Sequence, residues 1–212
     1  MPGFHITVIA KQPIPGKVKT RLCPPLTAEQ AAQIAAACLH DTFEAVRTCA
    51  DQHDDVRPVA LIDGEAGPWI PAGFEVVHQQ GDGLGERLAN GFDELGPGLI
   101  VGMDTPSAGR YLNAAIAAVR EGNDAIGMTH DGGYWGLALA TPDPAVFTGV
   151  AMSSDHTGAD QFARMQQLGR TVSVMPTVHD LDRFEDIAPI VADLPASRLA
   201  SVAISLLNRR WG

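Results

Sequence analysis

The chain has 212 residues, 45% of them hydrophobic, which suffices for the core of one globular domain over residues 1–212. Its 25 acidic residues outnumber the 15 basic ones, and the net charge of −10 argues against binding to nucleic acid or to an anionic membrane surface. The apolar runs are no longer than strands, so we expect no membrane insertion, and three cysteines without a CxxC pair indicate a cytoplasmic protein.

Hydrophobic patterning predicts strands that alternate with helices along the chain. The β-branched run 4–10 is typical of a buried strand, and the run 99–103 predicts another that ends at Asp104. Further strand-like runs span residues 57–62, 74–78, 124–130, 134–140 and 171–175. Helices are expected from the capping box at Thr27, over 84–95, from Thr105 and Pro106, over 157–168, from Asp182 and Glu185, and over 195–207. This order predicts an α/β fold whose mainly parallel sheet carries helices on both faces.

The loop after the first strand concentrates positive charge. It contains all three lysines of the chain, Lys11, Lys17 and Lys19, together with Gly16 and Arg21. Ligands of open α/β sheets bind outside the carboxyl ends of the strands, and ammonium and guanidinium groups suit phosphate oxygens. The loop therefore predicts a site for a small, highly charged anion, with a solvated basic loop as the alternative. Neither a P-loop nor a GxGxxG pattern follows the strand, which argues against P-loop NTPases and dinucleotide-binding dehydrogenases.

Two aspartates follow strand-like runs and are candidate metal ligands. Asp104 ends the run 99–103, and Asp182 comes after the run 171–175. Two such carboxylates can hold a hard divalent cation that bridges phosphates, with water as the remaining ligand. The alternative for both is helix capping, because Asp104 or Thr105 can cap the helix that begins at Pro106 and Asp182 can pair with Glu185.

Three glycine- or hydroxyl-containing segments have both a structural and a functional interpretation. Asp131, Gly132 and Gly133 read as a tight hairpin turn or as backbone that a sugar or acceptor approaches. The segment with Gly83 and Gly85 is typical of a turn that leads into a helix, or of backbone that contacts a bound nucleotide. The loop 152–158 offers Ser154 and His156 among its hydroxyl, carboxylate and imidazole groups, but no GxSxG motif supports a hydrolase triad.

Five motifs together resemble one known family. KQPIPGKVKTRL (11–22), GLGERL (83–88), GMDTP (102–106), DGGYW (131–135) and DLDRFEDI (180–187) occur in the order found in a bacterial family of glycosyltransferase-A-fold proteins assigned as nucleotide-diphospho-sugar transferases. Some of its members carry an arsenosugar-biosynthesis label. The first and last motifs also resemble the phospholactate or phosphoenolpyruvate guanylyltransferases. The chain departs from many relatives at Met103, where they have a small residue before the aspartate.

The resemblance implies the glycosyltransferase-A fold and a nucleotide pocket built from the first-strand loop and the GLGERL segment. It also implies that Asp104 is a metal ligand. We therefore expect a nucleotide-binding set and an acceptor-binding set of residues. The first comprises Lys11, Gly16, Lys19, Arg21, Gly83 and Gly85, and the second comprises Asp131, Gly132, Gly133, Ser154 and His156.

Together these features favour a metal-dependent transferase with a nucleotide-activated donor and a small-molecule acceptor. Lys19 and Arg21 would neutralise the phosphates during transfer, and Mg²⁺ or Mn²⁺ on Asp104 and Asp182 would clamp the diphosphate. Glycosyl transfer from a nucleoside diphosphate-sugar is the leading interpretation. Nucleotidyl transfer from an NTP to a sugar phosphate or phosphoacid is the first alternative, and a non-catalytic nucleotide-binding protein is the second.

Overall fold

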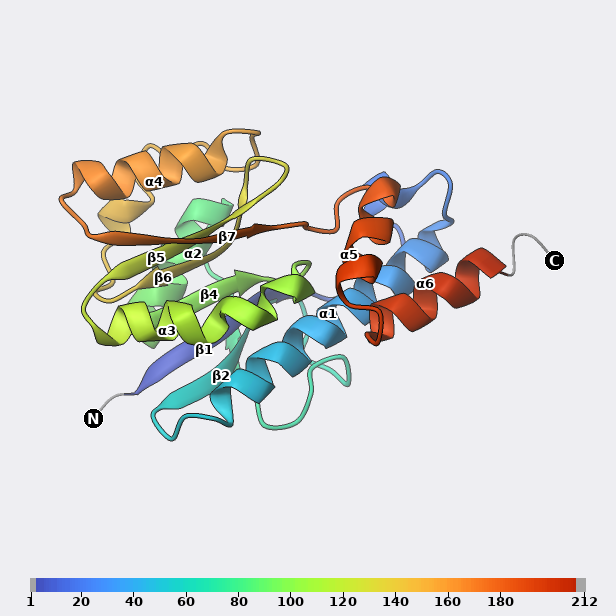
Figure 1. Cartoon of the computed structure of the whole chain (residues 1–212), viewed down its shortest axis with the longest axis horizontal. Coiled ribbons are helices and arrows are strands. Elements are labelled where there is room, and N and C mark those ends of the chain that lie inside the picture. Colours follow the sequence, from blue (N-terminus) through green and yellow to red (C-terminus); the bar gives the residue numbers. More distant parts are fainter. Residues whose placement is uncertain (1–2, 209–212) are drawn as a thin grey trace.

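The computed structural model describes residues 3–208 and contains, within that range, one seven-stranded sheet (Figure 1). The strand order is β3-β2-β1-β4-β6-β5-β7, and β6 runs antiparallel to both of its neighbours while all other neighbouring pairs are parallel. The strands are β1 (Phe4–Lys11), β2 (Val56–Asp63), β3 (Glu75–His78), β4 (Gly98–Gly102), β5 (Asp124–Thr129), β6 (Tyr134–Leu139) and β7 (Val172–Val178). The expected α/β fold with a mainly parallel sheet is confirmed.

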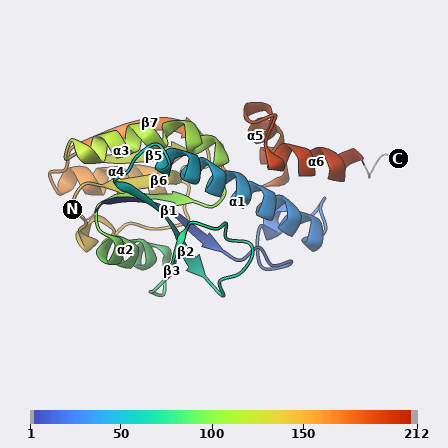
Figure 2. The same cartoon turned by 90° about the horizontal axis from the view of Figure 1, so that it is seen from below.

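Helices cover both faces of the sheet, as Figure 2 shows. One face packs against α1 (Ala28–Ala50) and α3 (Leu112–Arg120), and the other packs against α2 (Leu84–Leu95) and α4 (Thr157–Gln167). The strands of the sheet interior are apolar on both sides because each face is covered. The expected capping box begins α1: Thr27 Oγ1 accepts a hydrogen bond from Gln30 N, and Gln30 Oε1 accepts one from Thr27 N.

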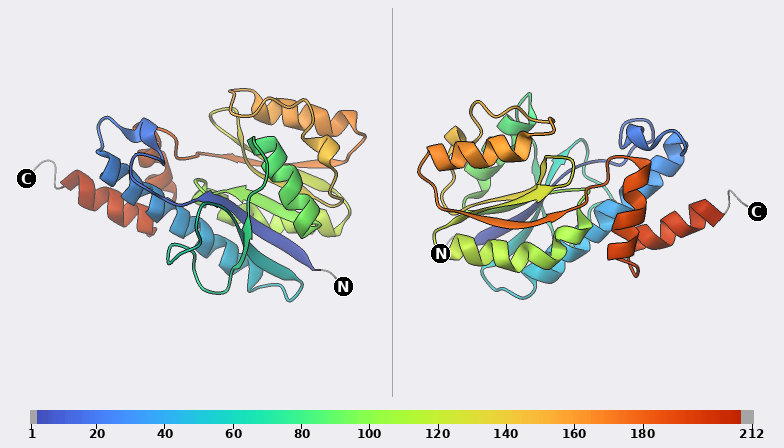
Figure 3. Two further views of the ribbon diagram at one scale, coloured as in Figure 1. Left: turned by 180° about the vertical axis from the view of Figure 1, so that it is seen from behind. Right: turned by 45° about the horizontal axis from the view of Figure 1, so that its top comes forward.

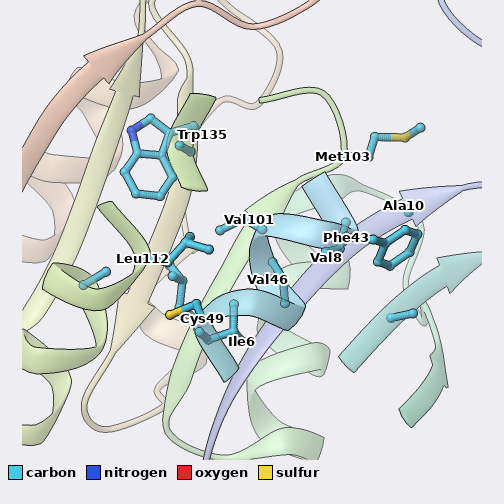
Figure 4. Packing of buried hydrophobic residues seen from close by; sticks show 14 of the residues in the cluster. Ile6, Val8, Ala10, Phe43, Val46, Cys49, Val101, Met103, Leu112 and Trp135 are labelled. Atoms are coloured by element: carbon cyan, nitrogen blue, oxygen red, sulfur yellow. The ribbon is translucent and has the colours of Figure 1, made fainter. Parts of the chain in front are cut away.

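The largest hydrophobic cluster lies between the sheet and α1 (Figure 4). Val8 of β1 and Val101 of β4 pack with Phe43 of α1, which is fully buried. Burial of a side chain of this size stabilises the fold by about 2 kcal/mol. Trp135 is also buried, and its Nε1 donates a hydrogen bond of 3.0 Å to the carbonyl of Pro176. The core thus fixes the carboxyl ends of β1 and β4 and the start of β6 relative to one another.

A third cluster extends the molecule beyond the carboxyl edge of the sheet (Figure 3). The N-terminal half of α1 packs here against α5 (Ile187–Asp193) and α6 (Arg198–Asn208). Asp41 of α1 caps α6, because its two carboxylate oxygens accept hydrogen bonds from the backbone N–H groups of Arg198 and Leu199 at 3.0 and 2.8 Å. Leu181, which follows β7, is fully buried in this cluster.

Two predicted helix starts differ from the structure. The segment opened by Pro106 is a 3₁₀ helix (Pro106–Tyr111) that continues into α3. Near residue 182, another 3₁₀ turn (Phe184–Asp186) precedes α5, and the capping carboxylate is Asp186 rather than Glu185. Asp186 Oδ2 accepts hydrogen bonds from the N–H groups of Asp182 and Arg183 at 3.0 and 2.5 Å. Capping therefore does not use the Asp182 side chain.

The last helix begins at Arg198 instead of residue 195 because Asp41 supplies its cap there. None of the helices within residues 3–208 is both long and apolar enough to span a bilayer.

Candidate functional site

Three adjoining cavities lie at the carboxyl edge of the parallel strands, and Asp104 borders all of them. The acidic cavity, about 650 Å³, lies beside the ends of β4, β5 and β7 and includes Asp131 and Asp180 in its wall. The cationic cavity, about 250 Å³, lies against the loop after β1 and includes Lys11, Lys17, Lys19 and Arg21. The apolar cavity, about 450 Å³, lies over β1, β2 and β4 and includes Ile9, Leu88 and Val101. Ligand binding at this edge is the general rule for open α/β sheets.

Lys19 and Asp104 form an ion pair at the junction of the acidic and cationic cavities. Lys19 adopts a left-handed backbone conformation (φ 48°), and its side chain is only 12% exposed. Burial alone would lower the pKa of Lys19, but the Asp104 carboxylate outweighs it, so this pKa is raised and the ammonium keeps its charge. Thr105 does not use its side chain as a cap either, because its hydroxyl faces the carbonyl of Gly102.

A second ion pair joins the β1 loop to the segment after β7. Arg21 Nη1 lies 2.9 Å from Asp182 Oδ2, and both residues line the acidic and cationic cavities. The N–H of Leu181 donates a hydrogen bond of 3.0 Å to the carbonyl oxygen of Asp104. This bond connects the exits of β4 and β7, and Lys19, Arg21, Asp104 and Asp182 consequently face one site.

Asp180 is a site residue that the sequence analysis missed. It lines the acidic cavity, and burial together with the nearby charges of Asp131 and Asp104 raises its pKa to about 7. The signal was present, because Asp180 lies closer to the end of β7 than Asp182 does. Arg183 lines the same cavity and was also missed.

The hairpin 131–133 joins β5 to β6, and the glycines in it have different surroundings. Asp131 Oδ1 accepts hydrogen bonds from Thr129 Oγ1 (2.6 Å) and Gly133 N (2.9 Å), and all three residues line the acidic cavity. Gly132 has a φ of +90°, and a Cβ there would lie 1.7 Å from the carbonyl oxygen of Asp155. Gly132 does not itself line the acidic cavity, and its lack of a side chain permits this backbone contact within the protein.

The loop before α4 packs directly against the hairpin, since Gly158 N donates a hydrogen bond of 2.9 Å to the carbonyl oxygen of Gly132. Ser153, Ser154 and Asp155 line the acidic cavity, as the expectation for Ser154 requires. His156 does not line it: its ring bonds to Asp155 Oδ1 at 2.8 Å, and this bond raises the pKa of the imidazole. The imidazole instead pairs with the carboxylates of Asp155 and Asp160 outside the walls of this cavity.

The predicted glycines of the nucleotide set lie outside the cavity walls. Gly83 is the N-cap residue of α2, and a Cβ at Gly85 would lie 3.3 Å from Met152 Cε. They flank Leu84, the first residue of α2, which lines the acidic and apolar cavities. Gly16, with φ +75°, has no atom within 4 Å of a Cβ position and lies in a turn just before Lys17 of the cationic cavity.

The apolar cavity has a polar side that the sequence analysis did not identify. Gln79 Nε2 donates hydrogen bonds to the carbonyl oxygens of Ala10 and Leu61 at 2.9 and 3.0 Å. Arg87 Nη1 bonds to Asp63 Oδ2 at 2.9 Å and to Gln79 Oε1 at 3.2 Å. Gln79, Arg87 and Asp63 all line the cavity, so a hydrogen-bonding edge faces an apolar floor.

The chemistry of the carboxylates at this site fits a hard divalent cation. Within residues 3–208, no group of three or more acidic, His or Cys side chains is arranged as a ready metal site. Asp104 and Asp182 nevertheless place two carboxylates on the border of the cationic cavity, and each is paired with a cationic side chain in this structure. Mg²⁺ commonly takes one or two protein carboxylates and completes its shell with water and substrate phosphates.

Comparison with solved structures shows the fold. A protein from Desulfovibrio desulfuricans G20, described as a "putative nucleotide-diphospho-sugar transferase", superposes with a TM-score of 0.82 at 22% identity and covers 97% of this chain and 95% of its own. The protein Rv0371c of Mycobacterium tuberculosis H37Rv, crystallised with manganese, superposes with a TM-score of 0.53 at 16% identity, and the match covers 90% of this chain and 98% of Rv0371c. A nucleotidyl transferase from Methanothermobacter superposes with a TM-score of 0.55 at 14% identity, and the match covers 93% of this chain and 100% of the transferase.

These similarities confirm the glycosyltransferase-A-type fold expected from the motifs. A comparison with curated protein sequences gives no match. A family model for uncharacterized proteins conserved in bacteria matches residues 30–154, which is more than half of the sequence. The chain therefore belongs to this bacterial family, DUF2064.

Proposed function

We propose that the protein is a metal-dependent transferase that takes its group from a nucleotide-activated donor, with glycosyl transfer to a small-molecule acceptor as the reaction. The observation that carries the proposal is the convergence of an apolar, a cationic and an acidic cavity on Asp104. These cavities match the parts of the proposed substrates in the same order: a nucleoside suits the apolar cavity, a diphosphate suits the cationic cavity, and the transferred group with its acceptor suits the acidic cavity. The similarity in fold to the Desulfovibrio protein supports this assignment.

The cationic cavity is the proposed diphosphate site. Within the described residues, four cationic side chains and two carboxylates line it, so it carries a positive balance. Lys19 and Arg21 would bind the phosphate oxygens, with Lys11 at the boundary to the apolar cavity. Fixed positive charge next to a leaving diphosphate stabilises the charge that develops as the donor bond breaks.

Asp104 and Asp182 are the proposed ligands of Mg²⁺ or Mn²⁺, and a bound cation would supply further positive charge for the diphosphate. The manganese found with Rv0371c supports a cation in a protein of this fold. In this structure Lys19 pairs with Asp104 and Arg21 pairs with Asp182. A metal ion bound to the two carboxylates would neutralise them, and the side chains of Lys19 and Arg21 could then bind the phosphates. Met103, the residue before Asp104, also lines the cationic cavity.

The apolar cavity is the proposed nucleoside site. Its floor can contact a base and ribose, and Gln79, Asp63 and Arg87 can form hydrogen bonds along its edge. We also propose a cytoplasmic location, since the three cysteines are free thiols in the described structure, the state favoured by a reducing compartment.

Nucleotidyl transfer is the second candidate. The dense cationic loop suits a triphosphate, and the Methanothermobacter protein of similar fold is a nucleotidyl transferase. Product analysis separates the candidates. The protein is incubated with Mg²⁺ or Mn²⁺ and with either NDP-sugars or NTPs, each with a panel of acceptors. Release of NDP supports glycosyl transfer, and release of pyrophosphate supports nucleotidyl transfer.

A nucleotide that raises the melting temperature without forming either product would indicate a binding protein without turnover. If no nucleotide shifts the melting temperature, the proposal fails.

A further inference from the structure

The balance of charge changes across Asp104. Among residues 3–208, five aspartates and three cationic side chains line the acidic cavity, whereas the cationic cavity has two aspartates and four cations. The positive charge needed by a diphosphate thus lies on one side of Asp104, and an excess of negative charge lies on the other. The excess requires an explanation, because unpaired like charges in a partly buried cavity are unfavourable unless a ligand uses them.

The cations of the acidic cavity do not relieve this excess. Lys19 is paired with Asp104, Arg21 is paired with Asp182, and Arg183 Nε also lies 4.0 Å from Asp182. Among the described residues, neither Asp131 nor Asp180 forms an ion pair.

The remaining polar groups of the acidic cavity are hydroxyls. They come from the segment after β4, from the hairpin region and from the segment that leads into α4: Thr105, Thr129, Tyr134, Ser153, Ser154 and Thr157. Carboxylates and hydroxyls together are hydrogen-bonding partners for ligand hydroxyl groups, because a carboxylate accepts from two or more of them and a hydroxyl both donates and accepts. A phosphate or carboxylate on the ligand would instead face Asp131 and Asp180.

We infer that the acidic cavity selects an uncharged, polyhydroxylated acceptor, such as a sugar or polyol, and excludes phosphorylated or carboxylated ones through Asp131 and Asp180. The inference rests on the proposed function and decides between its two candidate reactions, since nucleotidyl transfer to a phosphoacid needs an anionic acceptor. A divalent cation that arrives with the diphosphate carries charge that the phosphates offset, so the excess on the acceptor side persists.

Acceptor pairs that differ only by a phosphate test the inference. The wild-type protein with Mn²⁺ and an NDP-sugar is given glucose or glucose 6-phosphate, and glycerol or glycerol 3-phosphate, and NDP release is measured. We expect the uncharged member of a pair to have the higher kcat/KM by about tenfold or more. The variants Asp131→Asn and Asp180→Asn should each reduce that ratio by about threefold or more.

Asp160→Asn is the matched control, because it removes the same charge from α4 at a residue outside the cavity walls, and its ratio should equal that of the wild type. Binding is measured in parallel as the shift in melting temperature that each acceptor adds to the NDP–Mn²⁺ complex.

Four outcomes would overturn the inference while the proposed function stands. Two concern the acceptor pairs: equal use of both members, or preference for the phosphorylated member. The other two are an unchanged ratio in both asparagine variants, and failure of every uncharged probe to bind the nucleotide-loaded protein. Absence of any nucleotide-induced shift in melting temperature would overturn the proposed function and the inference with it.

Discussion

The backbone N–H of Leu181 bonds to the carbonyl oxygen of Asp104 at 3.0 Å and joins two segments that are far apart in the sequence. Leu181 is fully buried, whereas its neighbours Asp180 and Asp182 line the acidic cavity. Anchoring of the leucine in the core thus presents both carboxylates to the site beside Asp104. The relationship explains how residues after β4 and after β7 form one acidic wall.

Lys19→Ala should weaken nucleotide binding more than it destabilises the fold. Lys19 lies at the junction of the two charged cavities, and loss of one charge-assisted contact to a phosphate reduces affinity about 10- to 100-fold. Titration calorimetry with a nucleoside diphosphate and Mn²⁺ measures this loss. Lys17→Ala is the control: Lys17 is exposed in the same loop, and its removal should change affinity by less than about threefold. Equal effects of the two substitutions would argue against a specific role for Lys19.

Asp180→Asn should stabilise the protein at pH 8. The pKa of this carboxyl is about 7 in the folded state against a usual 3.8, so the folded state holds the proton more tightly. Its stabilising contribution is complete below about pH 4 and is lost as the pH rises through 7. Asparagine does not ionise, so the variant avoids the cost of a buried negative charge. Urea unfolding should therefore show a larger increase in the free energy of unfolding for the variant at pH 8 than at pH 4. A gain that does not depend on pH would contradict the assigned cause.

The stability of the wild-type protein should fall in mild acid because of His5. The ring is fully buried, and burial lowers its pKa to about 3. Since the folded pKa lies below the unfolded value, the contribution of His5 is complete above about pH 6.5 and is lost progressively as the pH falls toward 3. Between pH 7 and pH 4.5 the free energy of unfolding should therefore fall by about 2–3 kcal/mol through His5.

His5→Gln tests the assignment. The variant loses the buried hydrogen bonds to Thr7 Oγ1 (2.7 Å) and the Gly96 carbonyl (3.1 Å), so it should be less stable at pH 7. Its free energy of unfolding should nevertheless change less between pH 7 and 4.5 than that of the wild type. Denaturant unfolding followed by circular dichroism at several pH values measures both quantities, and parallel pH curves would exclude His5 as the source.

Gly132→Ala should be far more damaging than Gly16→Ala. Both glycines have positive φ values, +90° and +75°, so each substitution incurs the left-handed penalty of about 1 kcal/mol. Only at Gly132 does the new Cβ meet backbone, the carbonyl of Asp155 at 1.7 Å. We expect a loss of about 3 kcal/mol or more there, measured by thermal or denaturant unfolding. Similar losses at the two positions would show that the hairpin and the loop before α4 can separate.

Local patterns were sufficient to predict the strands, the bounds of α2 and α4 to within one residue, and the position of the cationic loop. Apolar runs identified the strands, and the rule that ligands bind at their carboxyl ends placed Lys19 and Asp104 at one site. What could not be predicted depends on contacts between distant segments. The burial that raises the pKa of Asp180 and the contact of Gly132 with Asp155 exist only after the strands have assembled.

The antiparallel direction of β6 has a consequence for how this fold can diversify. Leu139 at the end of β6 pairs with Gly98 at the start of β4, so the chain leaves the sheet at the edge opposite the cavities. Residues 140–156 must travel back to begin α4, and this return path delivers Ser153, Ser154 and Asp155 to the acidic cavity. Lengthening or shortening the return path would reshape what the cavity admits while strand pairing stays intact.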